Sequence, residues 1–212
     1  MKKYFIAIAG NIGAGKTTLS TLLSQRLGYE AFLESVADNP YLADFYADMQ
    51  RWSFHSQVFF LARRLLHHRQ LLERPDSVIQ DRTVYEDAEV FARNLYLQGY
   101  MHERDYLTYH ELYEAVTSIL PPPDLVIYLK ASVETLMARI QQRNRYYERQ
   151  IPRDYLEQLN KLYEEWVQHF SLCPVLTVPV DRLDFIANGE HLTLLTQRIR
   201  ERLQGKEIVS FD

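Results

Sequence analysis

The chain of 212 residues contains one cysteine and no long hydrophobic run, and both absences narrow its class. The lone Cys173 excludes an internal disulfide and a zinc site built on several cysteines, which is compatible with a reducing compartment. No apolar run approaches the roughly 20 residues of a membrane span. The apolar stretch Tyr4–Ala9 is shorter than the roughly 7–15 residues at the core of a secretory signal. We therefore expect a cytoplasmic protein with no membrane partner.

The chain also lacks a large excess of either charge. It has 24 Lys and Arg residues against 28 Asp and Glu residues, which gives a formal net charge of −4. Proteins that bind nucleic acids need clustered cations to neutralise phosphates, so we expect no nucleic-acid partner.

Glycine is scarce, with seven residues in all, yet three of them lie within six positions. Gly10–Thr17 matches the phosphate-binding pattern G-x-x-x-x-G-K-[ST] at every fixed position, between an apolar run and a helical pattern. Glycines allow successive backbone N–H groups to converge on phosphate oxygens. Lys16 supplies a cation for the β- and γ-phosphates, and the Thr17 hydroxyl can bind Mg²⁺. The predicted ATP-binding residues in this segment are Gly10, Asn11, Ile12, Gly13, Ala14, Gly15, Lys16, Thr17 and Thr18.

The same scarcity of glycine excludes a class of P-loop protein. No aspartate stands three residues before any of the seven glycines, so the D-x-x-G motif typical of GTPases is absent. Motor-type ATPases carry an apolar strand that ends in adjacent acids, and none of the expected strands does. The remaining reading is a small kinase that phosphorylates a metabolite. Two alternatives stay open: a nucleoside-monophosphate or other small-metabolite kinase, and a non-catalytic nucleotide sensor.

Short apolar runs alternate with longer helical patterns along the chain. This alternation predicts an α/β protein in which helices flank a five-stranded parallel sheet. Together with the phosphate-binding segment, it gives an expected P-loop kinase fold with an arginine-rich lid. No linker or repeat is present, so we expect a single domain over 1–212. The expected strands are Tyr4–Ala9, Tyr29–Leu33, Ser77–Gln80, Leu125–Leu129 and Val175–Val180. The expected helices are Lys16–Leu27, Asn39–Leu72, Val84–Leu97, Glu103–Leu120, Val133–Gln142, Arg153–Phe170 and Leu192–Leu203.

Charged residues follow two of the expected strands. Glu34 comes just after the second strand, and Asp81 and Arg82 follow the third. The carboxyl ends of parallel strands meet at the sheet edge where ligands bind, so these side chains are expected beside the phosphate-binding segment. Phosphoryl transfer needs an acid to orient or deprotonate the attacking hydroxyl, and a cation for the transferring charge. Glu34 or Asp81 can do the first, and Arg82 the second.

Five short sequence blocks, spread over nearly the whole chain, match one known family in both their order and their spacing. They are Gly10–Thr18, Asn39–Leu42, Arg51–Gln57, Asp81–Asp87, and Arg143–Arg145 ahead of Ile151–Pro152. Together they resemble the deoxyribonucleoside kinase family, in particular its bacterial deoxyadenosine/deoxyguanosine kinase branch. The resemblance implies a homodimeric enzyme that uses ATP and Mg²⁺ to phosphorylate the 5′-hydroxyl of deoxynucleosides. We expect deoxyadenosine as the favoured substrate, with deoxycytidine or deoxyguanosine as secondary substrates.

The resemblance also implies which residues carry the transfer. It places Glu34 beside the sugar 5′-hydroxyl, and Arg82 in contact with both that hydroxyl and the phosphate region. Both Glu34 and Asp81 have been viewed as the proton acceptor in this family. We expect Glu34 to be the base and Asp81 to help Thr17 hold Mg²⁺. The predicted catalytic residues are Glu34, Asp81, Arg82 and Lys16.

Other positions match the family's nucleoside contacts. Tyr46 and Glu148 resemble the pair that hydrogen-bonds the 3′-hydroxyl, and Gln57 resembles the amide that reads the base edge. Arg64 and Asp87 match a charged pair that thymidine-type members lack, which argues against thymidine as the main substrate. The predicted substrate-binding residues are Glu34, Tyr46, Gln57, Arg64, Arg82, Asp87, Phe91 and Glu148, with Phe91 as an aromatic wall of the base slot.

An arginine-rich segment corresponds to the family's lid over the ATP phosphates. Arg139 and Arg143 stand at i and i+4, on one face of an expected helix, and Arg145 follows. The lid usually reads Arg-Gly-Arg, but here Asn144 stands in the glycine position. Asparagine tolerates a positive φ better than most non-glycine residues, so the turn is expected to persist.

Overall fold

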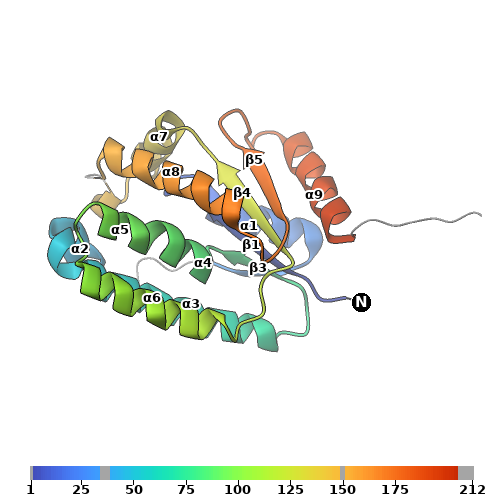
Figure 1. Cartoon of the computed structure of the whole chain (residues 1–212). Coiled ribbons are helices and arrows are strands. Elements are labelled where there is room, and N and C mark those ends of the chain that lie inside the picture. Colours follow the sequence, from blue (N-terminus) through green and yellow to red (C-terminus); the bar gives the residue numbers. More distant parts are fainter. Residues whose placement is uncertain (1, 34–38, 149–150, 205–212) are drawn as a thin grey trace, which may run out of the picture.

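The computed structural model describes residues 2–33, 39–148 and 151–204, and it contains a five-stranded parallel sheet (Figure 1). The strand order is β2-β3-β1-β4-β5. The expected α/β fold with a five-stranded parallel sheet is therefore confirmed. The strands are β1 (Phe5–Gly10), β2 (Glu30–Phe32), β3 (Val78–Asp81), β4 (Leu125–Lys130) and β5 (Val175–Pro179).

The three middle strands are buried because both faces of the sheet are covered, and β1 and most of β4 are apolar, while β3 ends in the polar residues Gln80 and Asp81. All six residues of β1 are buried, as are all four of β3 and the first five of β4. Strands covered on both sides are expected to be continuously hydrophobic rather than alternating. These burial patterns place the core on both sides of β1, β3 and β4. Each strand lies within two residues of its expected bounds at either end.

Helices cover both faces of this sheet (Figure 1). On one face α1 and α9 pack against each other. On the other lie α3, the α4–α5 segment, α6 and α8, as right-handed crossovers require for this strand order. The long helices are α1 (Lys16–Leu27), α3 (Met49–Glu73), α6 (Glu103–Thr117), α7 (Val133–Arg143), α8 (Arg153–His169) and α9 (Gly189–Gln204). The short helical segments are α2 (Leu42–Ala47), α4 (Val84–Glu86), the π-helical turn Asp87–Ala92, α5 (Arg93–Leu97) and the 3-10 turn Tyr146–Glu148.

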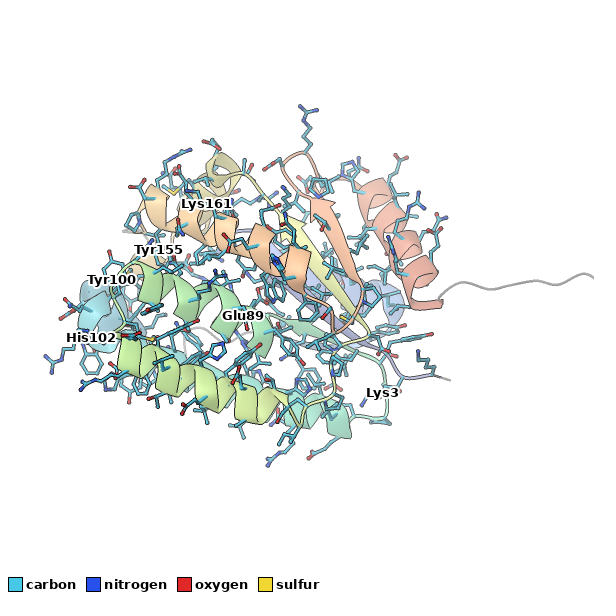
Figure 2. The ribbon with its side chains drawn as sticks, in the orientation of Figure 1. Lys3, Glu89, Tyr100, His102, Tyr155 and Lys161 are labelled. Atoms are coloured by element: carbon cyan, nitrogen blue, oxygen red, sulfur yellow. The ribbon has the colours of Figure 1, made fainter. Side chains whose placement is uncertain are left out.

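The prediction of one helix over Asn39–Leu72 was wrong, because two helices occupy this segment. The break falls at Asp48, whose backbone is extended (φ −147°, ψ 83°) and whose side chain accepts the N–H of Arg51. Aspartate is a favoured N-cap because its carboxylate satisfies a free N–H at a helix start. At the far end of α3, the Lys3 ammonium donates to the carbonyls of Leu71, Leu72 and Arg74 (Figure 2).

The expected helix Val84–Leu97 is helical, but its middle part is a π-helical turn rather than α-helix. Such turns frequently occur at functional sites, because one extra residue per turn changes which side chains share a face. Here Asp87 and Phe91, at the two ends of one such turn, both line the central cavity.

Within the described ranges 2–33, 39–148 and 151–204, no helix has the length and hydrophobicity needed to cross a lipid bilayer.

Candidate active site

The phosphate loop (Gly10–Thr17) connects the end of β1 to the start of α1, as its sequence predicts. Gly13 and Gly15 have φ values of 85° and 98°, which non-glycine residues rarely adopt. The buried Lys16 ammonium donates to the backbone oxygens of Gly10 (2.9 Å) and Asn11 (3.1 Å). The N-terminal end of α1 and the Lys16 cation lie together at this loop, an arrangement that favours an anion.

The side chain of Asn11 has a structural role in this loop. Its amide nitrogen donates to the Leu156 carbonyl (3.0 Å) and to Asn160 Oδ1 (2.7 Å), both on α8. Its amide oxygen accepts the N–H of Ile12. Of the predicted ATP residues, Asn11 thus supports the loop through its side chain, while the segment Ile12–Thr18 lines the cavity.

A cavity of about 660 Å³ extends from the phosphate loop. This volume is in the range of small-molecule binding sites. It brings together residues from the phosphate loop, helices α2, α3, α7 and α8, the π-helical turn and the β5–α9 connection. Predicted site residues on its wall include Tyr46, Gln57, Arg82, Asp87, Phe91, Arg139, Arg143, Arg145 and Glu148.

Four predicted residues of the described chain are not on this wall, and two of them are Gly10 and Asn11 of the phosphate loop. The other two, Asp81 and Arg64, lie behind the wall, where they contact Thr17 and Asp87 respectively. Glu34, the expected base, lies outside the described residues.

Asp81 and Thr17 meet at the floor of the site. The Thr17 hydroxyl donates to Asp81 Oδ2 at 2.5 Å. The other carboxylate oxygen, Oδ1, is buried and has no hydrogen-bond partner among the described residues. A hydroxyl and a carboxylate oxygen are ligands that suit Mg²⁺. This pair therefore fits the metal position that the sequence predicts.

Arg82 is held in an unusual backbone conformation at the end of β3, with φ at 67°. Its N–H donates to the Ile8 carbonyl, which extends the pairing of β3 with β1 by one residue. The guanidinium carbon lies 4.3 Å from the centroid of the Phe91 ring. Non-glycine residues with positive φ are strained and cluster at functional sites. The strain directs this cation toward the cavity, where the sequence analysis expects it.

Buried polar side chains form one part of the cavity wall and its support. Arg64 Nε and Asp87 Oδ2 form an ion pair at 2.8 Å, with side chains only 3% and 5% exposed. Gln57 Oε1 is buried and has no hydrogen-bond partner among the described residues. Buried polar atoms are nearly always hydrogen-bonded, so an unpaired one on a cavity wall indicates a ligand donor.

Glu148 pairs with Arg143 and Arg145, which the sequence resemblance assigns to a lid. Its carboxylate accepts Arg143 Nη2 at 2.6 Å and Arg145 Nη1 at 3.4 Å. Asn144 ends α7 in the left-handed conformation (φ 52°, ψ 37°), so the turn persists without the usual glycine. Arg139 donates to the carbonyls of Ala14 and Val180, which ties α7 to the phosphate loop.

Several residues of the cavity wall were not predicted from the sequence, including Leu42, Phe45, Phe60 and Gln142. Two further parts of the wall also escaped prediction. One is Leu183–Ile186 in the β5–α9 connection, where the Asp184 carboxylate accepts the N–H groups of Ile186 and Ala187. These backbone donors lower the pKa of Asp184. The other is Tyr155 near the start of α8 (Figure 2). Neither part carries a motif; the only local signal is the aspartate that begins the turn.

Comparison with known proteins decides the family. A family model described as deoxynucleoside kinase matches residues 6–204. The chain belongs to the deoxynucleoside kinase family. The resemblance seen in the sequence is thereby confirmed.

Two curated relatives and one solved protein illustrate the similarity. The chain is 40% identical over 200 residues to the deoxyadenosine/deoxycytidine kinase of Bacillus subtilis (strain 168), covering 93% of this chain and 92% of that one. It is 37% identical to the deoxyguanosine kinase of the same organism, covering 93% and 96%. Deoxyadenosine kinase from M. mycoides with the products dCMP and dCDP bound has a TM-score of 0.83 at 36% identity, covering 92% and 98%. The same enzyme with bound dATP has a TM-score of 0.82 at 34% identity, covering 93% and 100%. These structures confirm the P-loop kinase fold.

The phosphate loop packs so closely on α7 that Gly13 has no room for a side chain. A Cβ there would lie 2.9 Å from the Leu136 carbonyl oxygen and 3.0 Å from Ile140 Cγ1. Gly28 also has a positive φ (73°), but a Cβ there would meet nothing within 4 Å. A substitution at Gly13 would therefore bring both backbone strain and a steric clash, whereas one at Gly28 would bring backbone strain alone.

We expect Gly13→Ala to lower the free energy of unfolding by about 2–4 kcal/mol, from strain plus overpacking. The control Gly28→Ala should cost about 1–2 kcal/mol, from strain alone. Urea unfolding of both variants measures the difference. Equal losses would show that the contact between loop and α7 is not the constraint.

Proposed function

We propose that this protein transfers the γ-phosphoryl group of MgATP to the 5′-hydroxyl of 2′-deoxynucleosides, giving ADP and a deoxynucleoside 5′-monophosphate. The proposal covers one catalytic domain over 1–212. The observation that carries it is a single cavity with a phosphate loop at one end and the Gln57 and Asp87 side chains on its wall. Membership of the deoxynucleoside kinase family supports the same reaction.

The acceptor side of the cavity favours hydroxyl groups over a phosphate. Tyr46 and Glu148 lie on the wall, and a carboxylate such as Glu148 accepts a hydrogen bond from a sugar hydroxyl but repels a phosphate. The arginines beside Glu148 belong to the lid and pair with this carboxylate. A nucleoside-monophosphate kinase needs cations that bind an acceptor phosphate. Because Arg143 and Arg145 pair with Glu148 instead, this function is the second candidate.

In the proposed mechanism, Glu34 accepts the proton of the 5′-hydroxyl as this oxygen attacks the γ-phosphorus. Lys16 and Arg82 neutralise charge that develops on the transferring phosphoryl group. Thr17 and Asp81 would hold Mg²⁺, which supplies charge neutralisation at the β- and γ-phosphate oxygens when bound. Arg139, Arg143 and Arg145 would close over the phosphates and exclude water.

The base preference is proposed as deoxyadenosine, with deoxycytidine or deoxyguanosine second. The Gln57 amide presents one donor and one acceptor edge, and the Arg64–Asp87 pair presents charge near the exocyclic groups of the base. The relatives named deoxyadenosine/deoxycytidine kinase and deoxyguanosine kinase support this range of bases.

We expect an ATP-coupled assay across the four deoxynucleosides to give the highest kcat/KM with deoxyadenosine and the lowest with thymidine. A base that leaves one buried polar group unpaired loses about 1–3 kcal/mol, or roughly 5- to 150-fold in kcat/KM. A higher value for thymidine than for any purine deoxynucleoside would contradict the base preference.

The same assay tests the two other functions. Faster turnover of dAMP than of deoxyadenosine would favour the monophosphate kinase. No ATP consumption with any nucleoside would favour a nucleotide sensor.

The assignment of acids gives a separate prediction. We expect Glu34→Gln to lower kcat by about 10²–10⁴-fold, because the general base is removed, and Asp81→Asn to raise the Mg²⁺ concentration needed for half-maximal activity. Glu30→Gln is the matched control, since Glu30 is exposed on β2 and pairs with Arg74. Turnover retained by the Glu34→Gln, Asp81→Asn double variant would overturn both assignments.

We further propose that the protein is a cytoplasmic homodimer. Helices α3 and α6 pack together on one side of the molecule (Figure 1), and each exposes leucines, among them Leu66, Leu107 and Leu112. Exposed apolar side chains grouped on one layer favour association with another surface of the same kind.

Light scattering should give twice the 25.1 kDa mass of the chain. Leu107→Glu should shift the mass toward one chain, because it places a charge in the proposed interface. Leu194→Glu on α9 makes the same change at an equally exposed leucine on the opposite face of the sheet. A wild-type mass of one chain at working concentration would refute the dimer.

A further inference from the structure

Glu86 is a fully buried carboxylate close to the proposed active site. It is the third residue after Thr83 in a capping box, and its Oε1 accepts the Thr83 N–H at 2.8 Å. A capping box explains this first contact. It does not explain the second carboxylate oxygen, Oε2, which accepts the backbone N–H of Gly10 at 3.2 Å, 76 residues away in the sequence.

Tyr163 on α8 brings a hydroxyl to the same point. The hydroxyl oxygen lies 2.6 Å from Glu86 Oε2 and 2.9 Å from the Gly10 carbonyl oxygen, and it accepts Arg82 Nη1 at 3.1 Å. Burial, and secondly the Glu86 charge, hold the pKa of Tyr163 well above its usual value. The hydroxyl thus stays neutral and can donate its proton to Glu86 or to Gly10 while accepting from Arg82.

These contacts join both sides of the site. Arg82 Nη1 lies 3.7 Å from Glu86 Oε2, and its guanidinium rests on the Phe91 ring. Gly10 gives its N–H to Glu86, and its carbonyl accepts Lys16. The phosphate loop on the donor side and Arg82 on the acceptor side are therefore fixed to the same carboxylate and hydroxyl.

We propose that Glu86 and Tyr163 form a positioning pair that sets the distance between Arg82 and the phosphate loop for phosphoryl transfer. The pair acts through Arg82 and Gly10, since neither Glu86 nor Tyr163 belongs to the cavity wall. The proposal rests on the proposed function, because it assigns these residues to the transfer step.

A positioning role has a kinetic consequence that a packing role lacks. Neither Glu86 nor Tyr163 lines the cavity, so ground-state binding of the substrate at Gln57 and Asp87 should change little when one atom of the pair is altered. Correctly placed cations stabilise the charge that develops on the transferring phosphoryl group. A small displacement of these cations therefore lowers the rate of transfer more than it lowers the affinity for the substrate. Loss of the pair should therefore appear in kcat rather than in KM.

Tyr163→Phe tests the pair with the smallest change, because it removes one hydroxyl and keeps the ring. We expect kcat to fall about ten-fold or more, while the KM for the deoxynucleoside stays within about two-fold. Tyr128→Phe is the matched control. The Tyr128 ring stacks on the Tyr163 ring (5.6 Å between centroids, 15° between planes), but its hydroxyl reaches Glu164 instead. The control should keep the wild-type kcat, with both variants melting at similar temperatures.

Glu86→Gln is the second variant. An amide can still accept the Thr83 N–H, but it loses the charge that faces Arg82. We expect the same selective loss of kcat, and we expect the double variant with Tyr163→Phe to be about as slow as the slower single variant, because the two residues act as a unit.

Equal kcat for Tyr163→Phe and Tyr128→Phe would overturn the proposal, as would a lower melting temperature with kcat and KM unchanged. A crystal structure of Tyr163→Phe gives an answer that does not depend on substrate. Displacement of the Arg82 guanidinium from the Phe91 ring supports the pair, and an unmoved guanidinium overturns it. A wild-type protein without turnover would count against the proposed function alone, and the crystal structure would still decide the positioning role.

Discussion

The parallel pairing of β1 with β3 is the constraint on which the proposed active site depends. In this register Ile8 lies opposite Asp81, and the N–H of Arg82 donates to the Ile8 carbonyl, so the two strands leave the sheet side by side. β1 continues directly into the phosphate loop, while β3 delivers a carboxylate and then a cation. The hydroxyl of Thr17 meets that carboxylate because both chain segments emerge from the same edge. If β3 were shifted by one residue, the Asp81 side chain would move to the other face of the sheet and Arg82 would leave its position beside Ile8.

Helix α8 is the second support of this arrangement. It crosses the sheet far from the phosphate loop in sequence, yet it contacts the loop at three points: the Leu156 carbonyl, the Asn160 side chain and the Tyr163 hydroxyl. These positions are spaced i, i+4 and i+7, which places them on one face of the helix. The rest of that face is apolar and buried. One helix thus contributes to the core and, through three polar contacts, fixes the loop that is proposed to bind ATP.

Sequence alone predicted the parts of the molecule whose signal is local. Gly10–Thr17 and the apolar strands were placed within two residues, because glycine spacing and hydrophobic runs are properties of short segments. The division of Asn39–Leu72 at Asp48 was missed, since aspartate also occurs within helices and the helical pattern continues past it. Tyr46, Gln57, Arg64, Asp87, Phe91 and Glu148 came from family resemblance and not from any pattern. Glu86 and Tyr163 could not be paired from sequence, because 77 residues separate them and only the fold brings them together.

A tryptophan, Trp166, lies beside Tyr163, so its fluorescence can report on this part of the core. The protein has two tryptophans, and they occupy different environments. Trp166 is buried on α8 with its ring 6.2 Å from that of Tyr163. Trp52 lies on α3 between the Tyr41 ring and the Arg51 guanidinium, close to the α2–α3 junction. Emission from the first indole therefore reports on the buried aromatic cluster of α8, and emission from the second on the partly buried rings at the α2–α3 junction. Replacing either one by phenylalanine leaves a single indole, whose emission reports on its own surroundings without an attached dye.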